Sequence, residues 1–189
     1  MNNRRHFLHT LGAATALGTL SPLAALAQAL EQVKIYYGFP AGSSGDSVAR
    51  RVGEKLAGSA YTRNVAVVEN KPGAGGRIAL ETLKSAPADG SVLALSPFSC
   101  TSIYPHIYSK LSYDPARDFV PVSIAAVMHH GLAVGPLVPP DVRTVKDFLA
   151  WAKANPNQAS YGSPAAGSTP HFIGALRAAP AGRSPGRGA

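Results

Sequence analysis

The chain contains the loop Phe39-Pro40-Ala41-Gly42-Ser43-Ser44-Gly45-Asp46, between an apolar run from Val33 to Phe39 and a helical pattern that follows. We call residues 39–46 the first loop. Gly42 and Gly45 allow positive φ and carry no Cβ, so backbone N–H groups can approach a ligand closely. The helix start adds unpaired donors and a partial positive charge. The loop therefore predicts a cradle for a carboxylate or phosphate. A plain turn, in which Asp46 or Ser47 caps the helix, fits the same residues.

The same unit is repeated further along the chain. A second apolar run, Val65 to Glu69, leads into the second loop (residues 70–76), Asn70-Lys71-Pro72-Gly73-Ala74-Gly75-Gly76, and a helical pattern follows from Ile78 to about Ala86. A third run, Val92 to Ser96, completes a β-α-β-α-β order, which predicts a parallel sheet flanked by helices. Because the carboxyl ends of parallel strands meet at one edge, we expect the two loops to lie close together. The second loop is not G-x-G-x-x-G, and the chain has no G-x-x-x-x-G-K-[ST], so nucleotide phosphate is not the expected ligand.

Two helical patterns carry further information. The first, Asp46 to about Gly58, has one apolar face, which we expect to pack on the sheet and which consists of Val48, Val52 and Leu56. The second begins with Thr144 and Asp147, whose spacing predicts a capping box for a helix through about Ala154. Trp151 in that helix is expected to be a core residue.

The second half of the chain predicts another α/β lobe. A polar, proline-broken connection, Tyr113 to Phe119, is interpreted as the boundary between lobes. Apolar runs from Val120 to Val127 and from Leu132 to Val134 predict strands. The third loop (residues 161–171), rich in small residues and hydroxyls, is expected to lie between a strand and a helix and to face the first two loops across a cleft.

Residues 1–29 have the pattern of an export signal. Arg4 and Arg5 precede a mildly apolar stretch that ends in small residues, and the run from Asn3 to Leu8 resembles a twin-arginine signal, with ordinary Sec export also open. Pro22 and the small residues leave too few apolar positions for a membrane span of about 20 residues. The sequence thus predicts 1–29 as signal, 30–119 as a first lobe, 120–176 as a partial second lobe and 177–189 as a non-family, disordered tail.

Charge and cysteine content exclude several classes of protein. The net charge is +8, but five of the 18 basic residues lie at the chain ends, and residues 28–176 hold 13 basic against 10 acidic residues, a net charge of +3. No basic run with interleaved aromatics occurs there, which argues against nucleic-acid binding. The single cysteine, Cys100, rules out an internal disulfide and a multi-cysteine metal site, and we expect it to be buried and inert.

Four segments together resemble the Bug-type receptors of tripartite tricarboxylate transporters. They are Phe39-Pro40-Ala41-Gly42 through Asp46 with Ala49-Arg50; Glu69-Asn70-Lys71-Pro72-Gly73-Ala74-Gly75-Gly76; Tyr113-Asp114-Pro115 with Asp118-Phe119 and Pro121-Val122; and Tyr161-Gly162-Ser163 with Gly167-Ser168 and His171. The resemblance implies a periplasmic-binding-protein-like, two-lobe α/β architecture with an incomplete second lobe. It also implies a receptor without catalytic residues, metal or cofactor, which acts as a monomer, closes on a small carboxylate and delivers it to a membrane permease.

The resemblance also implies which residues contact the ligand. In the family, the first-lobe loops hold a carboxylate mainly by main-chain N–H groups and ordered waters. His171 is expected to support the third loop. The candidate ligand contacts are Phe39, Ala41, Gly42, Ser43, Ser44, Asp46, Gly73, Ala74, Gly75, Gly76, Ser163, Ser168 and Thr169.

Two departures from the family keep alternatives open. Ser43 and Ser44 stand where the family usually has more glycine, and the family pattern ends near Gly174, far short of the family's length. We therefore expect a truncation or frameshift, and a nonfunctional fragment is one alternative to a working receptor. A secreted hydrolase is another, although the chain has no G-x-S-x-G elbow and no H-E-x-x-H motif.

Overall fold

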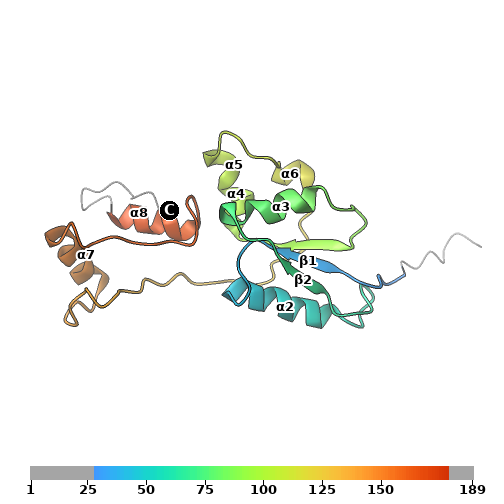
Figure 1. Cartoon of the computed structure of the whole chain (residues 1–189), viewed down its shortest axis with the longest axis horizontal. Coiled ribbons are helices and arrows are strands. Elements are labelled where there is room, and N and C mark those ends of the chain that lie inside the picture. The colour runs from blue at the N-terminus through green and yellow to red at the C-terminus, as the bar shows by residue number, and fades with distance from the viewer. Residues whose placement is uncertain (1–27, 179–189) are drawn as a thin grey trace, which may run out of the picture.

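The computed structural model describes residues 28–178, so the expected signal up to residue 27 and the tail from residue 179 lie outside the described residues. Its centre is a parallel sheet in the order β2-β1-β3, formed by β1 (Lys34–Tyr37), β2 (Val67–Asn70) and β3 (Val92–Leu95). Ile35 in β1 is paired with Val68 in β2 and Leu93 in β3. The predicted β-α-β-α-β order with a parallel sheet is confirmed (Figure 1).

Helices cover both faces of this sheet. Helix α2 (Ser44–Leu56) contacts β1 and β2, whereas α3 (Arg77–Lys84) contacts β1 and β3 from the opposite side (Figure 1). The inward face of α2 includes the small residues Gly45, Ala49 and Gly53. A Cβ on Gly53 would lie only 3.0 Å from the carbonyl oxygen of Ala66, so the helix approaches the sheet closely because its contact residues are small.

The apolar face predicted for α2 is therefore only partly the packing face. Val48, Val52 and Leu56 are half-buried, and Val52 packs at the edge of the core. The three side chains also line a groove of about 390 Å³ with Ala125 and Ala126. The prediction was wrong in part because side-chain size, as well as hydrophobicity, decides which helix face lies closest to a sheet.

The core of the first lobe consists of two clusters, Val33, Ile35, Ala49 and Ala66 in one, and Leu80, Cys100, Tyr104 and Tyr113 in the other. The second cluster includes residues of α3 and of the short helices α4 (Phe98–Ser102) and α5 (Tyr104–Ile107), and Phe119, which directly follows α6 (Pro115–Asp118), packs against it. Cys100 is fully buried, as expected, and burial raises the pKa of its thiol. The Tyr113 hydroxyl donates to the Cys100 carbonyl oxygen at 2.8 Å. This bond joins α4 to the segment that precedes α6.

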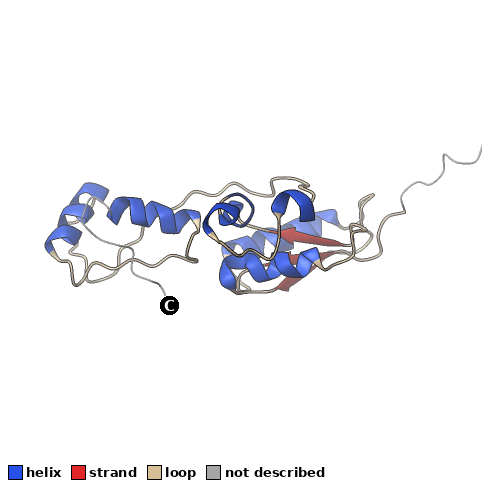
Figure 2. Cartoon of the chain, turned by 90° about the horizontal axis from the view of Figure 1, so that it is seen from above, coloured by secondary structure: helices blue, strands red, loops and turns tan. Residues whose placement is uncertain are grey.

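Residues 120–135 leave the first lobe as an extended segment, which Figure 1 shows in yellow to orange and Figure 2 shows as loop. Within the described residues no strand forms after β3, so the predicted strands at Val120 to Val127 and Leu132 to Val134 are wrong. Val120, Val122, Ile124 and Val127 are each at least 80% exposed. A strand exists only where its N–H and C=O groups pair with a neighbouring strand, and this segment has none among residues 28–178.

Two helices follow this segment, α7 (Val145–Ala154) and α8 (Thr169–Ala178). The capping box of α7 is confirmed: the Asp147 N–H donates to Thr144 Oγ1 and the Thr144 N–H donates to the Asp147 carboxylate, both at 3.1 Å. The prediction that Trp151 is a core residue is wrong, because it is half-buried and stacks on Phe148. The strand expected before the third loop does not form either. No helix in residues 28–178 is long and apolar enough to cross a membrane.

Candidate functional site

The first and second loops lie side by side, as expected from strands that end at one sheet edge. The Lys71 N–H donates to the Tyr37 carbonyl oxygen at 2.7 Å, which extends the β1–β2 pairing to the loops. A Cβ on Gly38 would lie 2.5 Å from the Gly76 Cα, closer than real Cβ atoms approach another atom. The chain therefore needs glycine at this crossing, where the ends of β1 and the second loop meet.

The second loop makes an unusual left-handed turn. Gly73, Ala74, Gly75 and Gly76 all have positive φ, at 131°, 49°, 66° and 93°. The Gly75 carbonyl oxygen accepts from the Tyr104 hydroxyl at 3.1 Å and from the Cys100 thiol at 3.4 Å, so the carbonyl side of the turn is held by the core. Within the described part of the chain, no protein acceptor takes the N–H groups of Gly73, Ala74 and Gly75. These donors can serve an anion.

Asp46 connects the two loops. Its side chain is nearly fully buried, and both carboxylate oxygens are occupied. Oδ2 accepts from the Gly42 N–H at 2.9 Å and from Arg50 Nε at 3.0 Å; Oδ1 accepts from Arg50 Nη2 at 3.1 Å and from Asn70 Nδ2 at 2.8 Å. Arg50 first, then Gly42 and Asn70, lower the pKa of this carboxyl to about 2. Asp46 therefore remains ionised and bonded within the protein.

Because of these bonds, only some of the first-loop N–H and hydroxyl groups remain available to a ligand. The Gly42 N–H is already donated to Asp46, and the Ser43 hydroxyl donates to the Pro40 carbonyl oxygen at 2.8 Å. The N–H groups of Ser44 and Gly45, at the start of α2, have no protein acceptor among residues 28–178. Of the remaining first-loop candidates, Ala41 is exposed and Phe39 is half-buried, with its ring beside Gly76.

The third loop contacts the same part of the first lobe. The Thr169 N–H donates to Ser99 Oγ at 3.1 Å, and the two hydroxyls are 3.2 Å apart. The Tyr108 hydroxyl donates to the Ala166 carbonyl oxygen at 3.2 Å. The structure thus brings Thr169 against α4, while the hydroxyls of Ser163 and Ser168 both donate to the Ala165 carbonyl oxygen within their own loop.

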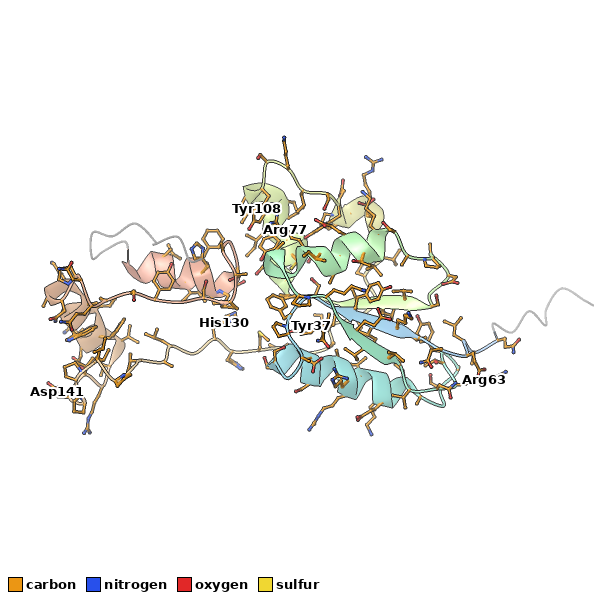
Figure 3. All side chains as sticks on the ribbon, viewed as in Figure 1. Tyr37, Arg63, Arg77, Tyr108, His130 and Asp141 are labelled. Carbon is orange, nitrogen blue, oxygen red and sulfur yellow. The ribbon has the colours of Figure 1, made fainter. Side chains whose placement is uncertain are left out.

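His171 and Arg77 complete the surroundings of the loops. Nδ1 of His171 accepts the Gly167 N–H at 3.2 Å, a contact that supports the third loop in the way expected. Arg77 Nε donates to the Ala74 carbonyl oxygen at 2.9 Å, and its guanidinium lies 4.1 Å from the centroid of the Tyr108 ring. Figure 3 shows Arg77 and Tyr108 next to each other. Arg77 is therefore anchored rather than a freely solvated charge.

Sequence reasoning named Arg50 and Asn70 only as parts of the family pattern and did not predict their bonds to Asp46. The spacing of Asp46 and Arg50 at i and i+4 signals a helical ion pair, and that signal was available. Asn70 ends β2, at the sheet edge where ligand loops gather, but its contact with Asp46 crosses 24 residues. No local pattern reveals such a contact.

A parallel α/β lobe of this kind is also found in periplasmic binding proteins. The chain is similar to a solved structure described as R. palustris Rpa4515 with adipate, with a TM-score of 0.69 and 27% identity over 82% of this chain and 50% of that chain. It is also similar to the periplasmic binding protein BugD, with a TM-score of 0.65, 27% identity and the same coverage. The fold is that of a periplasmic binding protein, with an incomplete second lobe.

A family model described as the tripartite tricarboxylate transporter family receptor matches residues 48–183, and the chain belongs to this family. The match runs past Gly174, where sequence analysis placed the end of the family pattern. Relatives include the UPF0065 protein in the gbd 5' region of Cupriavidus necator, 33% identical over 89% of this chain and 52% of that protein, and Protein BugT of Bordetella pertussis, 29% identical over 82% and 47%. The chain spans about half the length of these relatives. The family is one of receptors, not enzymes.

Proposed function

We propose that this chain is a periplasmic solute receptor that binds a small carboxylate through backbone N–H groups. The supporting observation is that the N–H groups of Ser44 and Gly45 in the first loop, and of Gly73 to Gly75 in the second, have no acceptor within residues 28–178. The two loops are adjacent, and the carboxylate of Asp46, the residue after Gly45, is already paired with Arg50. Such a site favours an anion, because helix-start amides and turn amides both carry partial positive charge.

The third loop supplies the far side of the proposed site. Thr169 lies at the start of α8 and contacts Ser99 across the lobes. Closure of the second lobe on the ligand would bring Ser163, Ser168 and Thr169 to its far end, driven by contacts that only the closed state makes. The receptor acts as a monomer in this proposal, in the periplasm, and passes its ligand to the permease of a tripartite transporter. That the solved relative holds adipate makes a dicarboxylate the first ligand to test.

The test is a calorimetric titration of the purified protein with adipate and citrate, with 1,6-hexanediol as a chain-matched control that lacks carboxylates. We expect saturable heat from a carboxylate and none from the diol. Chemical conversion of a carboxylate during the titration would instead favour an enzyme. Absence of saturable heat with every carboxylate would contradict the proposal and favour a fragment that does not bind.

One substitution tests the backbone donors directly. Ser44 is the first residue of α2, where proline is well tolerated, and Ser43 before it is extended at φ −69° and ψ 162°, as proline requires. Ser44→Pro removes one N–H without breaking the helix, whereas Ser44→Ala keeps it. Because a hydrogen bond to a charged group contributes about 1.5–3 kcal/mol, we expect Ser44→Pro to weaken binding at least about tenfold.

A matched proline away from the loops controls for the ring itself. Val145 is the first residue of α7, and Thr144 before it is also extended, at φ −119° and ψ 161°. Val145→Pro should leave carboxylate affinity unchanged, as should Ser44→Ala. Equal affinity for Ser44→Pro and Ser44→Ala would show that the Ser44 amide is not a ligand donor.

A further inference from the structure

We propose that Asp46 is a positioning residue, which fixes the first loop against the second so that their free N–H groups form one preformed anion site. This inference rests on the proposed function for its meaning, but its geometry is independent of any ligand. Asp46 lies on α2, which is part of the first unit, and Asn70 ends β2, which is part of the second. The bond between them is therefore a direct link between the two loops.

The link is a closed triangle of side chains. Asp46 accepts from Arg50 and from Asn70, and Arg50 Nη2 also donates to Asn70 Oδ1 at 3.3 Å. Each of the three side chains thus contacts the other two. Such mutual bonding restricts every rotamer in the network, because moving one side chain breaks bonds to both partners.

Two of the three side chains also bond to the backbone of the first loop, each at one point. Asp46 accepts the Gly42 N–H from the first loop, and Asn70 Nδ2 also donates to the Phe39 carbonyl oxygen at 3.1 Å. The two ends of the first loop are therefore tied to the residue that begins the second. Gly42 itself has φ 82°, and a Cβ added there would meet no atom within 4 Å, so bonding rather than packing holds it in place.

The charge of the triangle suits an anion site. A free carboxylate beside the proposed ligand would repel it, but Arg50 pairs with both oxygens of Asp46 in a forked arrangement. The Arg50 side chain is 49% exposed and that of Asp46 only 4%, so the solvent side of the pair is the cation. Because four donors already occupy Asp46, it is not placed to accept an ammonium group from a ligand. Asp46 should act equally on ligands with and without an amine.

Amide hydrogen exchange of the ligand-free protein tests the link without any ligand. Asp46→Asn removes the charge and the forked pairing at nearly constant size. We expect exchange about tenfold faster at the bonded amide of Gly42 in the first loop and also at that of Gly76 in the second, because the second loop loses its tie to the first. Asn70→Ala should accelerate the same two amides. Faster exchange at Gly42 without faster exchange at Gly76 in Asp46→Asn would overturn the proposal.

Asp118→Asn is the matched control. The Asp118 carboxylate also accepts a backbone N–H, that of Asp114 at 2.8 Å, and pairs with a cation, Lys84 at 2.9 Å, but it lies on α6. We expect this variant to leave exchange at both loops unchanged. An equal acceleration of the two loops in Asp118→Asn would mean that general loss of stability, and not the Asp46 link, frees them.

Titration of adipate and 2-aminoadipate then separates positioning from ligand contact. If the wild-type protein binds either, Asp46→Asn should weaken both about tenfold and by the same factor, with Asp118→Asn as wild type. A selective loss of 2-aminoadipate would make Asp46 an amine contact, and unchanged affinities would make it structural only; both results contradict the proposal. If the wild type binds neither, the proposed function loses its support, whereas the exchange result still decides the link.

Discussion

Residues 30–119 and residues 120–178 carry similar apolar runs but form very different structures. In the first region, three such runs pair as strands, and Val33, Ile35 and Tyr104 are almost fully buried. In the second, the apolar runs stay extended and exposed, while two helices form. The difference teaches that a helix satisfies its hydrogen bonds within one segment, whereas a strand depends on a neighbour.

The largest expected difference between the two regions is in proteolysis. Thermolysin cleaves beside apolar residues, and residues 120–134 offer many of these in an exposed segment without backbone hydrogen bonds among the described residues. Cleavage within β1 requires opening of the sheet, which costs up to the full free energy of unfolding, about 5–15 kcal/mol. We expect the first cuts within 120–134 and a protected fragment spanning 30–119. Mass spectrometry of a brief digest checks this, and early cuts in β1 or β3 would contradict the comparison.

The next prediction makes the same substitution in both regions. Val33 is 0% exposed and Val122 is 80% exposed. Val33→Ala removes buried methyl groups and leaves a cavity, so the free energy of unfolding should fall by about 2 kcal/mol. Val122→Ala should change it by less than about 0.5 kcal/mol. Urea denaturation followed by circular dichroism measures both, and a similar loss in the two variants would show that Val122 is covered in solution.

The sequence predicted features that depend on local patterns and missed features that depend on distant partners. The three strands, the two glycine-rich loops and helices α2 and α3 of the first lobe were predictable because hydrophobic runs and glycine-rich turns are local signals, and so was the Thr144 capping box. The short helices α4, α5 and α6 were not predicted. The strands after Val120 were wrong because their existence depends on a partner that no local pattern reveals. The inward face of α2 was misjudged because Ala49 and Gly53 allow closer packing than the larger valines. The Asp46 link was missed because it joins segments 24 residues apart.

Lowering the pH should reduce the stability contributed by Asp46 in the first region more than that contributed by Asp147 in the second. Asp46 in the first has its pKa lowered to about 2, from an unfolded value near 3.9, chiefly by Arg50. A lowered folded-state pKa contributes stability that is complete above about pH 4 and is lost as pH falls toward 2. Asp147 in the second has its pKa lowered chiefly by Thr144, but its bonds are exposed and should contribute less.

Urea denaturation between pH 7 and pH 2.5 measures this loss. Asp46→Asn should be less stable than wild type at pH 7, and the difference should shrink between about pH 4 and pH 2, because protonation then removes the same charge in the wild type. Asp147→Asn should show a smaller difference with the same direction. A constant gap between wild type and Asp46→Asn across this range would mean that the Asp46 charge does not stabilise the fold.

The smallest expected effect compares the caps of α7 and α2. Thr144 accepts the Asp147 N–H in a complete capping box, whereas Ser43, at the same position of α2, makes no side-chain bond to its helix amides. No residue of α7 is buried, while Gly45, Asp46, Ala49 and Gly53 of α2 are. Because tertiary packing supports α2 and a short helix without packing is marginal, α7 depends more on its cap.

Thr144→Ala should therefore destabilise α7 by about 1 kcal/mol, which corresponds to roughly fivefold faster amide exchange along residues 147–154. Ser43→Ala should change exchange along α2 by less, because the Ser43 hydroxyl bonds to the Pro40 carbonyl oxygen and the Tyr37 hydroxyl and to no amide of the helix. Equal acceleration in the two helices would show that α7 is packed in solution as firmly as α2.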